Sequence, residues 1–67
     1  MSKNVIIIPT YNEIGNIDIT LKTIEKLTEK FDVIVVDDNS PDGTGEFVQN
    51  AIDSKSYKLE IFLIKRK

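Results

Sequence analysis

The chain contains 67 residues with a formal net charge of −2, and it has no cysteine and no histidine. A chain of about 60 residues buries only about 60% of its unfolded surface, so this length allows one small domain at most. Without Cys or His, a thiol nucleophile, a disulfide framework, a zinc cluster and an imidazole base are excluded. Nine basic residues against eleven acidic ones give no positive excess for binding nucleic acid.

The apolar runs of the chain are short, and none approaches the roughly 20 residues that a transmembrane helix needs. Lys3 is followed by a strand-like run without a small-residue cleavage site, so we expect no signal peptide. Together these features predict a cytoplasmic location.

The first predicted strand covers residues 5–8, an unbroken β-branched run that Pro9 ends. A run without alternating polar residues is typical of a strand buried on both faces. A helix is expected next, because apolar residues recur at spacings of three and four while charged residues occupy the opposite face. The apolar stripe of this helix comprises Ile14, Ile17, Leu21, Ile24, Leu27 and Phe31.

The second predicted strand, residues 33–36, repeats the β-branched pattern. A shorter helix follows, and its apolar positions are Phe47, Val48, Ala51 and Ile52. Thr44 is the expected N-cap of this helix, and Glu46 is placed where a negative charge favours the positive helix end. The third predicted strand, residues 59–64, is interrupted by Glu60, which indicates a sheet edge or a thinner cover on one face.

This alternation predicts an α/β fold, a βαβαβ unit with a parallel sheet. Two right-handed crossovers in the same direction place both helices on one face and give the strand order 3-2-1. Strands that are apolar at every position then leave the other face of the sheet without a cover. We expect either a homodimer through that face or, as the preferred interpretation, a fragment that forms the first half of a larger domain.

Two polar loops follow the first two strands, residues 9–13 and 37–44. Ligands of open parallel sheets bind beyond the carboxyl ends of the strands, and neighbouring strands place these loops side by side. The loops supply an aromatic ring that can stack on a nucleobase and carboxylates that can accept from base N–H groups or ribose hydroxyls. Neither contains a glycine-rich phosphate motif.

Simpler structural roles stay open for most of these residues. Pro9 and Tyr11 could end the strand and cap the sheet, and Glu13 could favour a helix N-terminus. The interpretation as turn formers is preferred for Asn39, Ser40, Asp42 and Gly43. The adjacent Asp37 and Asp38 are stronger functional candidates, because two like charges at a buried strand end are unfavourable unless they are hydrogen-bonded or face a ligand.

The segments VIIIPTYNE (residues 5–13) and VVDDNSPDGT (residues 35–44) resemble family 2 glycosyltransferases with the GT-A fold. Within that family, Pro41 and Asp42 make the second segment most similar to the dolichol- or polyprenol-phosphate mannose synthase branch. The resemblance covers essentially the whole chain but only the beginning of such an enzyme. It implies that residues 1–67 are the incomplete nucleotide-sugar-binding part of a Rossmann-like glycosyltransferase domain.

The resemblance also implies roles for individual residues. The positions that line the nucleotide pocket in the family are Pro9, Tyr11 and Glu13 here. Those that contact the base and ribose are Val36 and Asp38, with Asp37 as a supporting neighbour. The implied donor is GDP-mannose, with UDP-glucose as the alternative, and the implied acceptor is a polyprenyl (dolichyl) phosphate, with inversion at the sugar carbon.

One motif of the family is missing from this sequence. The Asp-x-Asp pair that binds Mg²⁺ or Mn²⁺ on the diphosphate lies beyond the third strand in the family, and no Asp or Glu follows Glu60 here. Such a metal neutralises the departing diphosphate. We therefore expect the whole enzyme to use the metal at the cytoplasmic face of a membrane, and this chain to hold neither a metal nor a catalytic residue and to be inactive alone. A self-standing nucleotide-binding module, or a dimerising domain without catalysis, is the alternative.

Overall fold

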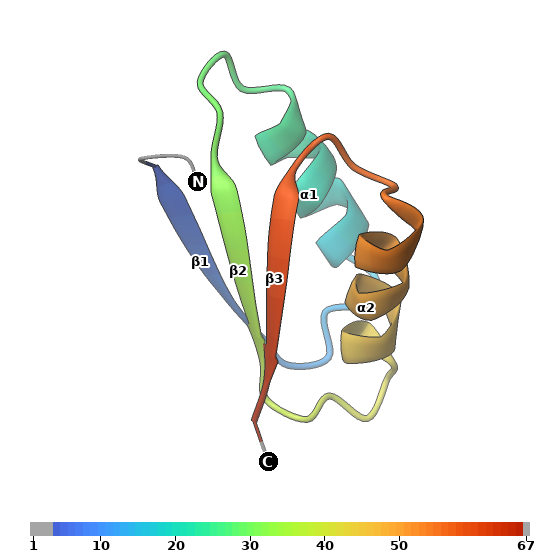
Figure 1. Ribbon diagram of the computed structural model, residues 1–67. Helices are drawn as coiled ribbons and strands as arrows, with labels where there is room; N and C mark the ends of the chain where they lie inside the picture. The colour runs from blue at the N-terminus through green and yellow to red at the C-terminus, as the bar shows by residue number, and fades with distance from the viewer. Residues whose placement is uncertain (1–3, 67) are drawn as a thin grey trace.

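The computed structural model describes residues 4–66 and contains five elements. In chain order they are β1 (Val5–Thr10), α1 (Ile17–Glu25), β2 (Asp32–Asp37), α2 (Thr44–Ser54) and β3 (Glu60–Lys65). The three strands form one parallel sheet in the order β1-β2-β3, and both helices lie on the same face of it (Figure 1). The predicted βαβαβ fold and its strand order are confirmed.

The register of the strands brings their carboxyl ends to one level. Thr10 at the end of β1 pairs with Asp37 at the end of β2, and Asp37 pairs with Lys65 at the end of β3. The loops that follow β1 and β2 therefore leave the sheet at the same edge, where the C-terminus also emerges (Figure 1).

The core lies between the sheet and the two helices. Its buried hydrophobic residues are Ile17, Leu21, Ile24, Val33, Val35, Val48, Ala51, Tyr57 and Ile61. Burial of an aliphatic side chain of this size stabilises a fold by about 1.5–3 kcal/mol. This single layer of contacts holds the strand ends, and hence the two loops, in place.

The opposite face of the sheet has no cover within residues 4–66. Val5, Ile7, Phe62 and Ile64 are exposed by between 45% and 64% on the edge strands. Ile34 and Val36 of the central strand are half-buried. The sequence pattern predicts this uncovered face, and the structure confirms it for the described residues, because both helices pack on the other side of the sheet (Figure 1).

The structure corrects the predicted end of β1. The strand does not stop before Pro9 but continues through it to Thr10. Proline lacks a backbone N–H, which excludes it from the middle of a sheet but not from an edge strand. β1 is such an edge, because among the described strands it pairs with β2 alone.

α1 is shorter than its apolar stripe predicts. Ile17, Leu21 and Ile24 are helical and buried, whereas Ile14 and Leu27 lie outside the helix and are 40% and 47% exposed. Phe31, the last position of the stripe, also lies outside α1. The helix ends early because the N–H groups of residues 26 and 27 bond to carbonyls three residues back, a tighter turn that does not extend an α-helix.

The predicted N-cap of α2 was wrong. The capping position is Gly43, whose φ of 92° is in the left-handed region that glycine adopts without strain. Thr44 is the first helical residue, and its hydroxyl is used elsewhere. Glu46 does lie in the first turn of α2, as expected.

Candidate functional site at the carboxyl edge of the sheet

The candidate site is formed by the first loop (residues 11–16), the second loop (residues 38–43) and the end of β3. Asp38 donates its backbone N–H to the carbonyl of Thr10 at 3.0 Å and so extends the ladder between β1 and β2. Arg66 donates its N–H to the carbonyl of Asp37 at 2.8 Å. These bonds tie all three strand ends together at the point where the loops begin.

The adjacent aspartates have opposite environments. Asp37 is 2% exposed and accepts hydrogen bonds from the Thr10 hydroxyl (2.8 Å) and from both the backbone N–H (3.1 Å) and the hydroxyl of Ser40. Burial raises the pKa of Asp37, but these bonds outweigh it and hold the pKa below the ordinary value. The Asp38 side chain is 59% exposed, with Oδ1 4.0 Å from Nε of Arg66. Asp37 is therefore satisfied inside the fold, and Asp38 is the carboxylate that a ligand can reach.

Two predicted site residues lie on the uncovered face of the sheet. Pro9 pairs with Val36, and Val36 pairs with Ile64, so the three form an apolar row across the last level of the sheet. Pro9 is exposed, Val36 is half-buried and Ile64 is 51% exposed. The row offers an apolar surface directly beside the loops.

The first loop presents the remaining two predicted residues. Tyr11 is 57% exposed, and its ring is accessible for stacking. Glu13 is half-buried, and its carbonyl accepts the N–H groups of Asn16 (2.9 Å) and Ile17 (2.8 Å), which starts the turn into α1. Asn12, between them, has a φ of 55°, a left-handed conformation that Asn tolerates better than most residues.

The second loop and the first residue of α2 hold the first loop through side chains that the sequence pattern assigns to a turn and a helix cap. Three consecutive backbone N–H groups of the first loop donate to these side chains. Asn12 donates to Ser40 Oγ (3.0 Å), Glu13 to Thr44 Oγ1 (3.0 Å) and Ile14 to Asp42 Oδ2 (3.1 Å). The regular spacing of residues 40, 42 and 44 was a visible signal, but their partners lie 28 to 31 positions away along the chain.

The arrangement suits binding of an organic ligand better than binding of a metal. Within residues 4–66, no group of three or more Asp, Glu, His or Cys side chains could hold a metal ion. The carboxylates of Asp37 and Asp42 are occupied by hydrogen bonds from the protein. The donor set described here therefore does not fit the divalent metal that the family resemblance implies. Neither α1 nor α2 has the length and hydrophobicity of a transmembrane helix.

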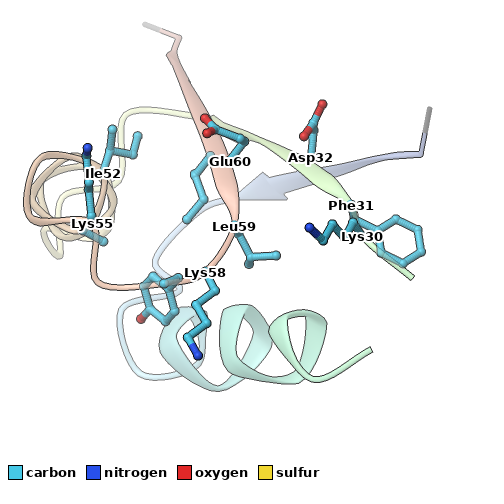
Figure 2. Close-up of a pocket in the computed structure, with 11 residues that line it drawn as sticks. Lys30, Phe31, Asp32, Ile52, Lys55, Lys58, Leu59 and Glu60 are labelled. Atoms are coloured by element: carbon cyan, nitrogen blue, oxygen red, sulfur yellow. The ribbon is translucent and has the colours of Figure 1, made fainter. Parts of the chain in front are cut away.

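A separate hollow of about 710 Å³ lies at the opposite, amino edge of the sheet and includes Asp32 and Glu60 in its lining. Figure 2 shows Lys30, Lys55 and Lys58 around it with their side chains pointing in different directions. Ligand sites are marked by polar groups that converge, and these do not. The carboxyl edge is therefore the stronger candidate.

Comparison with known proteins agrees with the motifs at this edge. The sequence pattern of Glycosyl transferase family 2 matches residues 5–67. An undecaprenyl-phosphate mannosyltransferase of Micrococcus luteus is 54% identical over 41 residues, which are 61% of this chain and 17% of that protein. A polyprenol monophosphomannose synthase of Mycolicibacterium smegmatis is 42% identical over 43 residues, 64% of this chain and 16% of that protein.

A third relative transfers a different sugar according to its name. The undecaprenyl-phosphate 4-deoxy-4-formamido-L-arabinose transferase of Aeromonas hydrophila is 31% identical over 65 residues, 91% of this chain and 20% of that protein. The chain thus spans about a fifth of the length of these relatives. No solved structure matches the chain significantly. Because the family pattern extends over nearly all of the sequence, this chain belongs to glycosyl transferase family 2.

Proposed function

We propose that this chain supplies the nucleotide-binding half of the donor site of a polyprenyl-phosphate mannosyltransferase. Its substrates would be GDP-mannose and a polyprenyl (dolichyl) phosphate, with inversion at the sugar carbon. The observation that carries the proposal is the pairing of Thr10 with Asp37, because it makes Tyr11 and Asp38 leave the sheet side by side, both more than half exposed.

The chemistry of these side chains suits a nucleoside. The Tyr11 ring is available to stack on a base, and such stacking contributes about 1–3 kcal/mol. The Asp38 carboxylate can accept two hydrogen bonds, either from the ribose hydroxyls or from the base. Guanine offers two N–H groups side by side on its Watson–Crick edge, whereas uracil offers one. This difference favours GDP-mannose over UDP-glucose, the alternative donor.

Pro9 and Val36 are proposed to contact the same nucleotide from the uncovered face, with Glu13 at the rim of the pocket and Asp37 as a support. The names of the three relatives all contain a polyprenyl-type lipid, undecaprenyl phosphate or polyprenol, but they differ in the sugar. The relatives therefore give stronger support to a polyprenyl phosphate as the acceptor than to mannose as the transferred sugar.

We propose that the whole enzyme uses Mg²⁺ or Mn²⁺, bound by residues outside positions 4–66. We also propose that the whole enzyme acts at the cytoplasmic face of a membrane. On this proposal residues 1–67 contain no catalytic group. We expect no transfer of mannose from GDP-mannose to a polyprenyl phosphate when only the 67-residue chain and Mg²⁺ or Mn²⁺ are supplied.

Calorimetric titration of the chain with GDP, and with UDP for comparison, tests the proposal. GDP is expected to bind more tightly than UDP, and Asp38→Asn or Tyr11→Ala is expected to weaken GDP binding about tenfold or more, the size of one charged hydrogen bond or one stacked base. Asp53→Asn, which alters an exposed carboxylate on α2, serves as the control. A folded chain that binds neither nucleotide would contradict the proposal.

One observation favours a second candidate function, a module that dimerises through the sheet. Val5, Ile7, Phe62 and Ile64 expose apolar side chains on the uncovered face. A self-associating chain would show a sedimentation coefficient that rises with concentration, and Ile7→Lys would abolish the rise. A monomer at all concentrations that still binds GDP would exclude this candidate and leave the donor half-site.

A further inference from the structure

Two hydroxyl groups act as relays between the first loop and a carboxylate each: that of Ser40 in the second loop and that of Thr44 at the start of α2. The first relay runs from the N–H of Asn12 to the hydroxyl of Ser40, which in turn donates to Oδ1 of Asp37. A hydroxyl has one proton to donate and two lone pairs that accept. Because the Ser40 hydroxyl donates its hydrogen bond to the carboxylate, the lone pairs of its oxygen are directed toward the N–H of Asn12.

The second relay has the same form. The N–H of Glu13 donates to the hydroxyl of Thr44, and this hydroxyl donates to Oδ1 of Asp42. The other oxygen of Asp42 accepts the N–H of Ile14 directly. Burial raises the pKa of Asp42, but the hydrogen bonds from Thr44 and Ile14 outweigh it and hold the pKa below its ordinary value, so the carboxylate stays charged near neutral pH. Hydrogen bonds to a charged acceptor are about twice as strong as neutral ones.

The consequence concerns the segment that carries Tyr11 and Glu13. The three backbone N–H groups that follow Tyr11, at residues 12 to 14, all donate to side chains of the protein. They are not free to cradle a phosphate, as loop amides do in other nucleotide sites. What they do instead is fix the backbone on either side of Glu13 and directly after Tyr11 before any ligand arrives.

We propose that Asp42 is a positioning residue for the nucleotide: with Thr44 and Ser40 it holds the first loop in the conformation that presents Tyr11 and Glu13. This inference rests on the proposed function of the carboxyl edge. A loop that is ordered in advance loses less conformational entropy on binding, so the ligand binds more tightly without any contact to Asp42 itself.

Asp42→Asn isolates the contact between the loops. Oδ1 of Asp42 accepts both the N–H and the hydroxyl of Thr44, whereas Oδ2 accepts the N–H of Ile14. An asparagine keeps its single oxygen where the two bonds are and turns its NH₂ group toward Ile14. The substitution therefore preserves the start of α2 and removes the bond to the first loop.

The first measurement is amide hydrogen exchange. In Asp42→Asn the N–H of Ile14 is expected to exchange about tenfold faster, the effect of losing one hydrogen bond to a charged group, while the N–H groups of Val33 and Val35 in the core exchange as before. Saturation with GDP is expected to slow the exchange of Ile14 again. The control Asp53→Asn is expected to change none of these rates.

The second measurement is the dissociation constant of GDP, which we expect to rise about tenfold in Asp42→Asn as the ligand has to order the loop itself. Thr44→Val provides an independent variant, because valine has the shape of threonine but leaves the N–H of Glu13 without its acceptor. It is expected to weaken GDP binding in the same way.

Three results would overturn the inference. Unchanged exchange at Ile14 in Asp42→Asn would show that the loop is not held by this carboxylate. Faster exchange at Ile14 with an unchanged affinity for GDP would show that holding the loop does not matter for the ligand. Faster exchange throughout the core in both variants would show a general role in folding. Absence of GDP binding by the unaltered chain would refute the proposed function first, a result distinct from these three.

Discussion

At the scale of single residues, the buried carboxylate of Asp37 restricts the space at the start of α2. A β-carbon at Gly45 would lie 2.9 Å from Oδ2 of Asp37 and 3.0 Å from Cε of Lys65. The carboxylate cannot retreat easily, because Thr10 and Ser40 hold it. Glycine at this position therefore allows α2 to begin directly beside the charge.

Gly45→Ala is expected to destabilise the fold by about 1–3 kcal/mol, the usual cost of overpacking a tight site. The unfolding free energy from urea denaturation measures this. Gly15→Ala is the matched control, because a β-carbon there would meet no atom of residues 4–66 within 4 Å, apart from those of Gly15 itself and its two chain neighbours. A loss of stability at Gly45 no larger than at Gly15 would contradict the interpretation.

At the scale of elements, α1 depends on contacts with the segment that leads into β3. The helix has only nine residues, a length that is marginal in isolation. Tyr57, which is 9% exposed, donates its hydroxyl to Asp18 of α1, and the N–H of Lys58 donates to Glu25 near the other end of the helix. Burial, followed by the bond to Asp18, raises the pKa of the Tyr57 hydroxyl well above its ordinary value.

Tyr57→Phe is expected to destabilise the chain by about 1 kcal/mol, because Asp18 loses a hydrogen bond while its ion pair with Lys22 (3.1 Å) is retained. Tyr11→Phe removes an exposed hydroxyl and is expected to leave stability unchanged. Thermal unfolding of the two variants side by side distinguishes a specific tie from a general effect of losing a phenol. Equal melting temperatures for both would argue against the tie.

At the scale of the whole molecule, the carboxylates make the folded state less stable as the pH falls into the acidic range. The pKa values of Asp18, Asp37, Asp42 and Glu46 are all lowered in the folded chain. Hydrogen bonds are the common cause, and at Asp37 and Asp42 they outweigh the opposing effect of burial. The unfolded chain therefore binds more protons than the folded chain in the acidic range, so stability rises with pH there.

The stabilising effect of these carboxylates is expected in full above their unfolded pKa values, near about pH 4. It is lost as the pH falls through the lower pKa values of the folded state. Urea midpoints measured from pH 7 downward should decline below that point. Asp37→Asn is expected to be less stable at pH 7 and to lose less on acidification. An unchanged pH profile in this variant would show that Asp37 contributes nothing to it.

Much of the architecture follows from local patterns. The β-branched runs at residues 5–8 and 33–36 predicted two of the strands, and the motifs beside them led to the family. The limits of α1 could not be predicted in this way. The apolar stripe extends from Ile14 to Phe31, but the hydrogen bonds of residues 16, 26 and 27 confine the helix to its middle.

The order of strands and helices, the position of the two polar loops and the family can be predicted from the sequence, because each depends on residues that are close along the chain. Which of the two adjacent aspartates turns inward is set by tertiary contacts. The binding of the first loop by Ser40, Asp42 and Thr44 is set by tertiary contacts as well. Those contacts join residues about 30 positions apart, and their geometry is set by the parallel register of β1 and β2 rather than by any local preference.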